Sequence, residues 1–141
     1  MKAEDFLRPL VYSRVLDHFY HHCHNLTYGE SFVSDHALFA AFYAELGLQY
    51  DQLAEYLIAT TGSASFQTQM INDAVAQKLS EYPVETMSPE IMFSVALQLE
   101  AEYYEYLVRL DAVGSVGVKN MVGAMAELAD VRKYKIQQRL K

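Results

Sequence analysis

Four side chains in the first half of the sequence could together bind a metal ion. His24 and His36 are twelve positions apart, and Asp51 and Glu55 follow with a spacing of four. Side chains four residues apart project from one face of a helix, so both carboxylates could reach a common ion. Each feature also has an ordinary explanation, because such acid pairs are frequent on solvated helices and a histidine on an apolar face is often a packing residue. The four residues are therefore candidate ligands.

The amino-acid composition limits which metal ligands and which partners the protein can have. The single cysteine, Cys23, excludes an internal disulfide and a thiolate zinc site, so a metal site would have to use His, Asp and Glu. The 141 residues fit one domain, spanning 1–141. The acids in MKAEDFLRPL do not fit a signal peptide and no window is apolar enough to span a membrane, so we expect a cytoplasmic protein without membrane partners. The net charge of -7 disfavours broad electrostatic binding of nucleic acid, so DNA is not an expected partner.

The spacing of apolar residues predicts four long helices. Apolar positions recur every three or four residues, as on one face of an amphipathic helix. Ser88, followed by Pro89, is a typical helix start, and glycine is a typical stop. The predicted helices cover about Phe6 to Asn25, Gly29 to Gly62, Ser88 to Leu110, and Val118 to near the C-terminus.

A shorter helix is expected between the second and third long helices. The segment SFQTQMINDAVAQKLSEYP, bounded by Gly62 and Pro83, has weaker periodicity. No segment favours a strand. The sequence therefore predicts an all-α, ferritin-like four-helix bundle with a long crossover that contains a short helix.

Helix geometry separates the candidate ligands. His36 and Asp51 lie fifteen residues apart on one predicted helix, which places them about 22 Å apart along its axis. One chain cannot bring both to a single ion. They could meet if a second copy laid the same helix antiparallel across a two-fold axis, so that His36 of each chain faced Asp51 of the other. Such a dimer would hold two sites, each shared between subunits.

The order of these residues resembles the signature of the Dps family, the small ferritin-like proteins of starved bacteria. The resemblance rests on His24, Gly29, Phe32, His36, Asp51 and Glu55, which agree in type and spacing, and covers HCHNLTYGESFVSDHALF and YDQLAEYL. It extends more weakly to VGVKNMVGAMAELADVRKYKIQQRL, which looks like the last helix of the family.

This resemblance implies a hollow dodecamer built from two-fold dimers, with a ferroxidase centre between subunits. Such a centre oxidises Fe(II), preferably with hydrogen peroxide rather than dioxygen, and Fe(III) is stored inside the shell. His24 and His36 would be the nitrogen ligands from one subunit, and Asp51 and Glu55 the carboxylates from its partner, with Glu55 bridging two irons. Imidazole suits Fe(II) and carboxylate suits the Fe(III) that forms; zinc is a possible surrogate.

The sequence departs from the family pattern at several positions. The aspartate usual four residues after the second histidine is Ala40, which removes one oxygen ligand and predicts a weak second iron position. The usual tryptophan and arginine are Asn25 and Tyr56. Candidate electron donors are then the local tyrosines, whose ordinary explanation is packing: Tyr28, Tyr43, Tyr50 and Tyr56. Glu45 is flanked by neutral residues, which predicts a thin acidic patch inside the shell.

Other assignments stay open at this point. A His/Cys group in YHHCH, His21 to His24, could bind zinc or copper at the surface. Glu100, Glu102 and Glu105 lie close together on the third long helix, but a site inside the bundle would usually add Glu-x-x-His, and Ile58 stands three residues after Glu55. The chain could also be a ferritin-like shell or scaffold with impaired iron chemistry. Nucleoid binding rests only on the basic C-terminal segment VRKYKIQQRLK, whose cations also suit a helix C-terminus.

Overall fold

The computed structural model describes all residues, 1–141, and consists of helices without strands. Two short 3₁₀ turns, η1 (Ser63–Ser65) and η2 (Val84–Thr86), flank the short helix of the crossover. The five α-helices are α1 (Ala3–Leu26), α2 (Phe32–Thr61), α3 (Thr68–Ser80), α4 (Pro89–Val113) and α5 (Val116–Arg139). The predicted four long helices and the shorter one between them are confirmed. None of the helices is long and apolar enough to cross a membrane.

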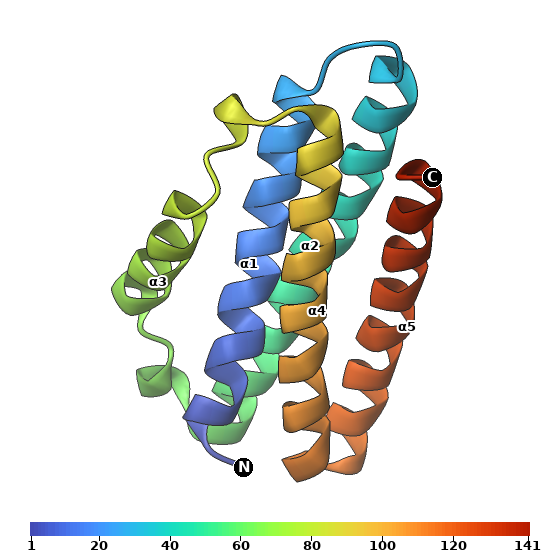
Figure 1. The fold of residues 1–141 in the computed structure, drawn as a ribbon. Helices are drawn as coiled ribbons and strands as arrows, with labels where there is room; N and C mark the ends of the chain where they lie inside the picture. The colour runs from blue at the N-terminus through green and yellow to red at the C-terminus, as the bar shows by residue number, and fades with distance from the viewer.

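The four long helices lie side by side as a bundle, with α3 outside it against α1 (Figure 1). Following the chain in Figure 1, α1 and α2 form an antiparallel pair, and α4 and α5 form a second one. The crossover climbs the length of the bundle between them, so α2 and α4 run in the same direction. This is the ferritin-like connection that the sequence predicts.

Local sequence signals set most helix ends. The Ser88 hydroxyl accepts a hydrogen bond from the Ile91 amide at 3.2 Å, and Pro89 occupies the first position of α4. Gly62, after the last residue of α2, has φ of +92°, which only glycine adopts without strain. The predicted start of α1 is three residues late, because the helix begins at Ala3 and continues through Pro9. The lost hydrogen bond at Pro9 is tolerated because this buried residue packs in the bundle.

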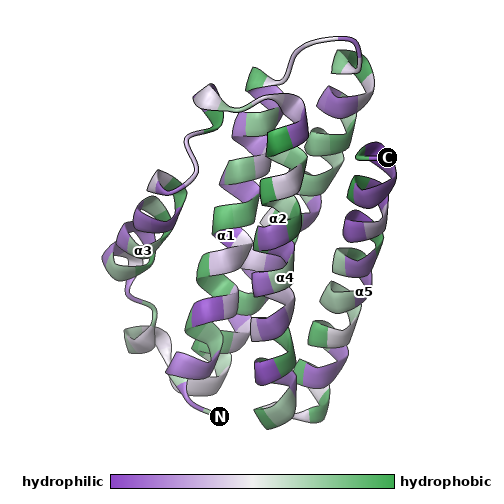
Figure 2. Ribbon diagram, in the orientation of Figure 1, coloured by the Kyte–Doolittle hydropathy of each residue, from purple (hydrophilic) through white to green (hydrophobic).

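One apolar core joins all the helices. Its fully buried members include Phe19 of α1, Phe39 of α2 and Phe93 of α4, and the last two stack with ring centroids 4.5 Å apart. Hydrophobic and hydrophilic residues alternate along each long helix, as an amphipathic bundle requires (Figure 2). The core fixes the rotation of each helix, and so the direction in which its polar side chains point.

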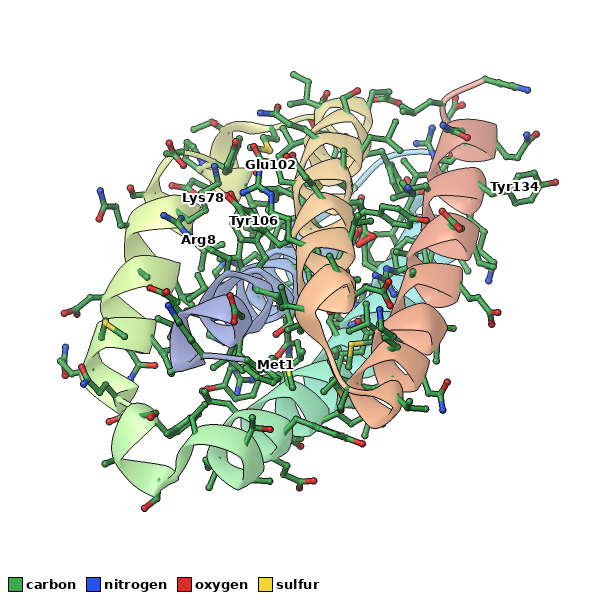
Figure 3. All side chains as sticks on the ribbon, turned by 90° about the horizontal axis from the view of Figure 1, so that it is seen from below. Met1, Arg8, Lys78, Glu102, Tyr106 and Tyr134 are labelled. Atoms are coloured by element: carbon green, nitrogen blue, oxygen red, sulfur yellow. The ribbon has the colours of Figure 1, made fainter.

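Polar contacts attach α3 to the bundle. Lys78 of α3 lies 3.5 Å from a carboxylate oxygen of Glu102 on α4, with its ammonium 5.7 Å from the centroid of the Tyr12 ring. Figure 3 shows Lys78 near Glu102, Arg8 and Tyr106, where α3 meets the bundle. Burial and the Glu102 carboxylate raise the pKa of Tyr12 to about 12.

Candidate metal centre

His24 and His36 form a reciprocal pair at the junction of α1 and α2. Their rings stack with centroids 3.6 Å apart and an interplanar angle of 20°. Nδ1 of His24 lies 2.8 Å from the backbone oxygen of His36, and Nδ1 of His36 lies 2.7 Å from the backbone oxygen of His24. Each histidine therefore fastens the backbone of the other helix, and the two helix ends hold both rings in place.

This contact determines which nitrogen of each ring is free. A carbonyl oxygen only accepts hydrogen bonds, so both Nδ1 atoms must carry the proton and donate it. In the neutral imidazole the other nitrogen, Nε2, then keeps its lone pair. Metal-binding histidines commonly have their second nitrogen held by such a carbonyl. The pair therefore fits a metal ion that is bound through Nε2 of both rings.

Aromatic side chains surround the histidine pair. The Phe32 ring stacks on His36 with centroids 4.9 Å apart, and the Tyr43 ring lies edge-on to His24 at 5.5 Å. Tyr43 in turn stacks on His21 at 4.2 Å. His24 and His36 are both half-buried, which leaves one side of the pair open to solvent.

Asp51 and Glu55 lie far from this pair in the same chain. Both are exposed, and they follow His36 on the uninterrupted helix α2, so the axial separation of about 22 Å holds. No group of three or more His, Cys, Asp or Glu side chains in the chain could hold a metal ion. The structure thus brings His24 and His36 together and leaves the two carboxylates apart from them.

A buried ion pair lies next to the histidine pair. Asp35, which precedes His36 and is 1% exposed, accepts hydrogen bonds from Nε and Nη2 of Arg139 at 2.7 and 3.0 Å. Arg139 also lies 3.5 Å from a carboxylate oxygen of Glu90. The last turn of α5 is thereby tied to the first turns of α2 and α4. The sequence analysis did not single out Asp35, although its spacing of four from Phe39 places it on the buried stripe of α2.

The alternative surface site in YHHCH is not assembled. Cys23 is fully buried, and burial raises the pKa of its thiol well above the usual range. His21 packs on Tyr43, while His24 is turned toward His36. The acids Glu100, Glu102 and Glu105 also separate, because each pairs with a different cation: Arg132, Lys78 and Arg109.

The positions that depart from the family pattern have definite surroundings. Ala40 is half-buried one turn after His36, and its methyl group supplies no ligand. Among the local tyrosines, Tyr43 contacts His24, whereas Arg14 covers the Tyr50 ring at 3.6 Å. The Tyr56 hydroxyl packs against Gly117 of α5, where an added Cβ would lie 3.1 Å away.

Glu45, the acid of the predicted thin acidic patch, forms an ion pair within the subunit. Its carboxylate accepts a hydrogen bond from Nη1 of Arg132 at 2.9 Å, and Arg132 is 1% exposed. Nε of Arg132 donates to both carboxylate oxygens of the fully buried Glu100, at 3.0 and 2.9 Å. This cluster in the bundle centre was missed from the sequence. The signal for it is that Arg132 falls on the buried stripe of α5, Val122, Met125, Ala129, Arg132 and Ile136.

Three of the five cations in the C-terminal basic segment are engaged in ion pairs. Arg132 and Arg139 bind buried carboxylates, and Lys133 lies 3.4 Å from Asp130 and 4.1 Å from the Tyr104 ring centroid. Lys135 and Lys141 are the exposed cations without a salt bridge. Most of the segment's charge is therefore neutralised within the protein.

Comparison with solved structures identifies the fold. The chain superposes on Dps from Listeria monocytogenes with a TM-score of 0.78 and 22% sequence identity, over 99% of this chain and 94% of that one. No family model matches the sequence, and no curated protein matches it. The chain therefore has the fold of a Dps-type mini-ferritin, in agreement with the resemblance found in the sequence.

Proposed function

We propose that this chain is the subunit of a Dps-like mini-ferritin that oxidises Fe(II) at a site shared by two subunits. Fe(II) is the substrate, hydrogen peroxide the preferred oxidant, and Fe(III) is stored inside a hollow dodecamer built from two-fold dimers in the cytoplasm. Two Fe(II) ions supply the two electrons that cleave the O–O bond of one hydrogen peroxide molecule. Both of its oxygen atoms are thereby reduced to the oxidation state that they have in water.

The observation that carries this proposal is the reciprocal bracing of His24 and His36. Each Nδ1 is fixed by the other residue's carbonyl, at 2.8 and 2.7 Å, and both Nε2 atoms are free to bind an ion. A pair of fixed imidazoles is half of a ligand set. The missing half requires oxygen ligands, and no carboxylate of the same chain completes it.

The exposed face of α2 supports the proposal that a second copy of the chain supplies the oxygen ligands. Between His36 and Asp51 this face carries an exposed row with a spacing of three and four, Ala37, Ala41, Ala44 and Leu48, of which Leu48 is 69% exposed. Small side chains permit close approach of two helices, and exposed apolar residues favour contact with a partner. If the two-fold axis passes near Ala44, His36 of each subunit faces Asp51 and Glu55 of the other.

In this arrangement each residue has a defined part. His24 and His36 bind Fe(II) through Nε2, and Asp51 binds it from the partner subunit. Glu55 bridges two ions and favours the Fe(III) product, because carboxylate oxygen prefers the harder ion. Tyr43, which packs edge-on to His24, is the local tyrosine placed to supply an electron.

A complementation experiment tests the shared site. His36→Ala and Asp51→Ala each abolish peroxide-driven Fe(II) oxidation while the oligomer persists. Refolding the two variants together restores about a quarter of the wild-type sites, because half of randomly paired dimers are mixed and each mixed dimer has one intact site. The control mixture of His24→Ala with His36→Ala restores none, since both damage the histidine half. Equal failure of both mixtures would contradict the shared site.

Ala40 favours one second candidate, a ferritin-like shell with impaired iron chemistry. The half-buried methyl group next to His36 leaves the second iron position short of an oxygen ligand. Anaerobic Fe(II) titration separates the two functions. Saturable binding that is lost in His36→Ala supports the ferroxidase, and absence of binding above background supports the shell.

A further inference from the structure

A polar cluster fills the middle of the bundle, apart from the histidine pair. Glu45 of α2 and Glu100 of α4 both bind the guanidinium of Arg132 from α5, with nitrogen to oxygen distances of 2.9 to 3.0 Å. Glu100 and Arg132 are 0% and 1% exposed, whereas the Glu45 side chain is 31% exposed and reaches Arg132 from the edge of the core. Two carboxylates from facing helices thus converge on one cation in the core.

The cluster also contains buried polar atoms that have no partner. The Tyr103 hydroxyl of α4 donates to Oε1 of Gln49 at 2.7 Å, but Nε2 of Gln49 has no hydrogen-bond partner. The Tyr20 hydroxyl of α1 and Nη2 of Arg132 are unpartnered as well. Gln49 and Tyr20 are 2% and 0% exposed. Unpaired polar groups in a core cost free energy, so the cluster is not optimised for packing alone.

Helix-bundle proteins that bind metal ions through carboxylates hold the ions between facing helices. In those proteins glutamates project inward from several helices onto one point. Here the guanidinium occupies that point, and it supplies positive charge without a metal. Burial disfavours the ionised Glu100 and raises its pKa, and the Arg132 charge is the main opposing influence. Without a cation the buried Glu100 carboxylate would have no partner for its charge.

We propose that Arg132 is a built-in cation that fills a divalent-cation position in the bundle core, formed by Glu45 and Glu100. Its guanidinium keeps metal ions out of the core and confines metal binding to the surface of the subunit. When the guanidinium is removed, the position takes a hard divalent cation, such as Mn²⁺, with Glu45 and Glu100 as charged ligands. Water oxygens complete the coordination, since Mn²⁺ prefers an all-oxygen set. This inference does not depend on the proposed ferroxidase.

The test counts bound Mn²⁺ per chain through the loss of the free-ion electron paramagnetic resonance signal. Arg132→Ala makes room for an ion and is expected to bind one Mn²⁺ more per chain than wild type. Arg132→Lys keeps a cation in place, and Arg132→Ala combined with Glu100→Gln removes one charged ligand. Both are expected to bind no more than wild type. Arg132→Ala that folds without metal and takes up no additional Mn²⁺ overturns the proposal.

A folding measurement covers the case in which Arg132→Ala is unfolded alone. Circular dichroism is then recorded as Mn²⁺ is added, and the proposal predicts that Mn²⁺ restores the helical signal in Arg132→Ala. The double variant with Glu100→Gln serves as the control and does not respond. Failure of Mn²⁺ to restore the single variant, or equal restoration of both variants, overturns the proposal.

Discussion

Arg139 binds both carboxylate oxygens of Asp35, at 2.7 and 3.0 Å, and so joins the last turn of the chain to the helix that carries His36. The carboxylate is 1% exposed and adjacent to His36 in sequence. The last turn of α5 thereby closes the bundle at the level of the histidine pair.

Removal of this contact should destabilise the protein. Arg139→Gln leaves the buried Asp35 carboxylate without its charged partner, so we expect a loss of about 1.5–3 kcal/mol in unfolding free energy. Hydrogen exchange should accelerate in the first turn of α2. The control is Arg109→Gln, which removes an exposed pair with Glu105 and should change stability by less than about 0.5 kcal/mol. Equal effects of the two substitutions in denaturant unfolding would contradict the role of Arg139.

Ala40→Asp should strengthen the second iron position. On the proposed function, this change restores a carboxylate one turn after His36, and the number of Fe(II) ions bound per chain should rise in anaerobic titration. Ala40→Asn is the matched control, because it has nearly the same shape but no charge, and it should bind iron more weakly than Ala40→Asp. An unchanged stoichiometry in Ala40→Asp would show that the missing ligand is not what limits binding.

The buried thiol of Cys23 predicts a loss of stability in alkali. Burial raises its pKa, so the folded protein keeps the proton at a pH where the unfolded chain releases it. Below about pH 8.5 both states are protonated and the thiol contributes no pH dependence. Above it, unfolding is favoured by about 1.4 kcal/mol per pH unit.

Cys23→Ser is the variant that isolates this effect. Its own stability is lower because a hydroxyl is buried, but the alkaline slope between about pH 8.5 and 10 should decrease by the contribution of one group. The slope, measured by urea unfolding at several pH values, is the informative quantity. Native wild type should also resist thiol reagents until it unfolds, and identical slopes in the two proteins would exclude the thiol as the cause.

Two glycines near or within α5 should respond in opposite directions to alanine. An added Cβ at Gly123 would meet no atom within 4 Å, so Gly123→Ala should stabilise the helix by about 0.5–1 kcal/mol. At Gly114 it would lie 2.6 Å from Cγ1 of the buried Val118, so Gly114→Ala should destabilise by about 1–3 kcal/mol. Thermal unfolding of both variants provides the measurement, and a stabilised Gly114→Ala would contradict the contact.

The helices could be predicted because their signals are local. Ser88 and Pro89 start α4 as expected, and the period of apolar residues gave all four long helices. The start of α1 was placed three residues late because Ala3, Glu4 and Asp5 carry no large apolar side chain that would extend the periodic pattern. Proline is a local signal against a helix, but packing of Pro9 in the core outweighs it.

The candidate site was predictable only in part. The spacing of His24 and His36 identified both as candidate ligands. Their mutual hydrogen bonds could not be predicted, because they depend on the angle at which α1 meets α2. The buried charged residues were harder to predict, because Asp35 and Arg132 belong to residue types that are normally exposed. Their partners lie 104 and 32 residues away in the chain, and no local pattern links them.

The continuity of α2 makes the proposed site far more sensitive to insertions than to substitutions. A single helix carries both the histidine and the carboxylate half, and each added residue turns the following side chains by about 100° and moves them about 1.5 Å. One residue inserted between His36 and Asp51 would rotate Asp51 and Glu55 off the shared face in every copy at once. It would also move Leu53 and Leu57 out of the core. The length of this helix segment is therefore constrained twice, once by the packing of the subunit and once by the proposed pairing of subunits.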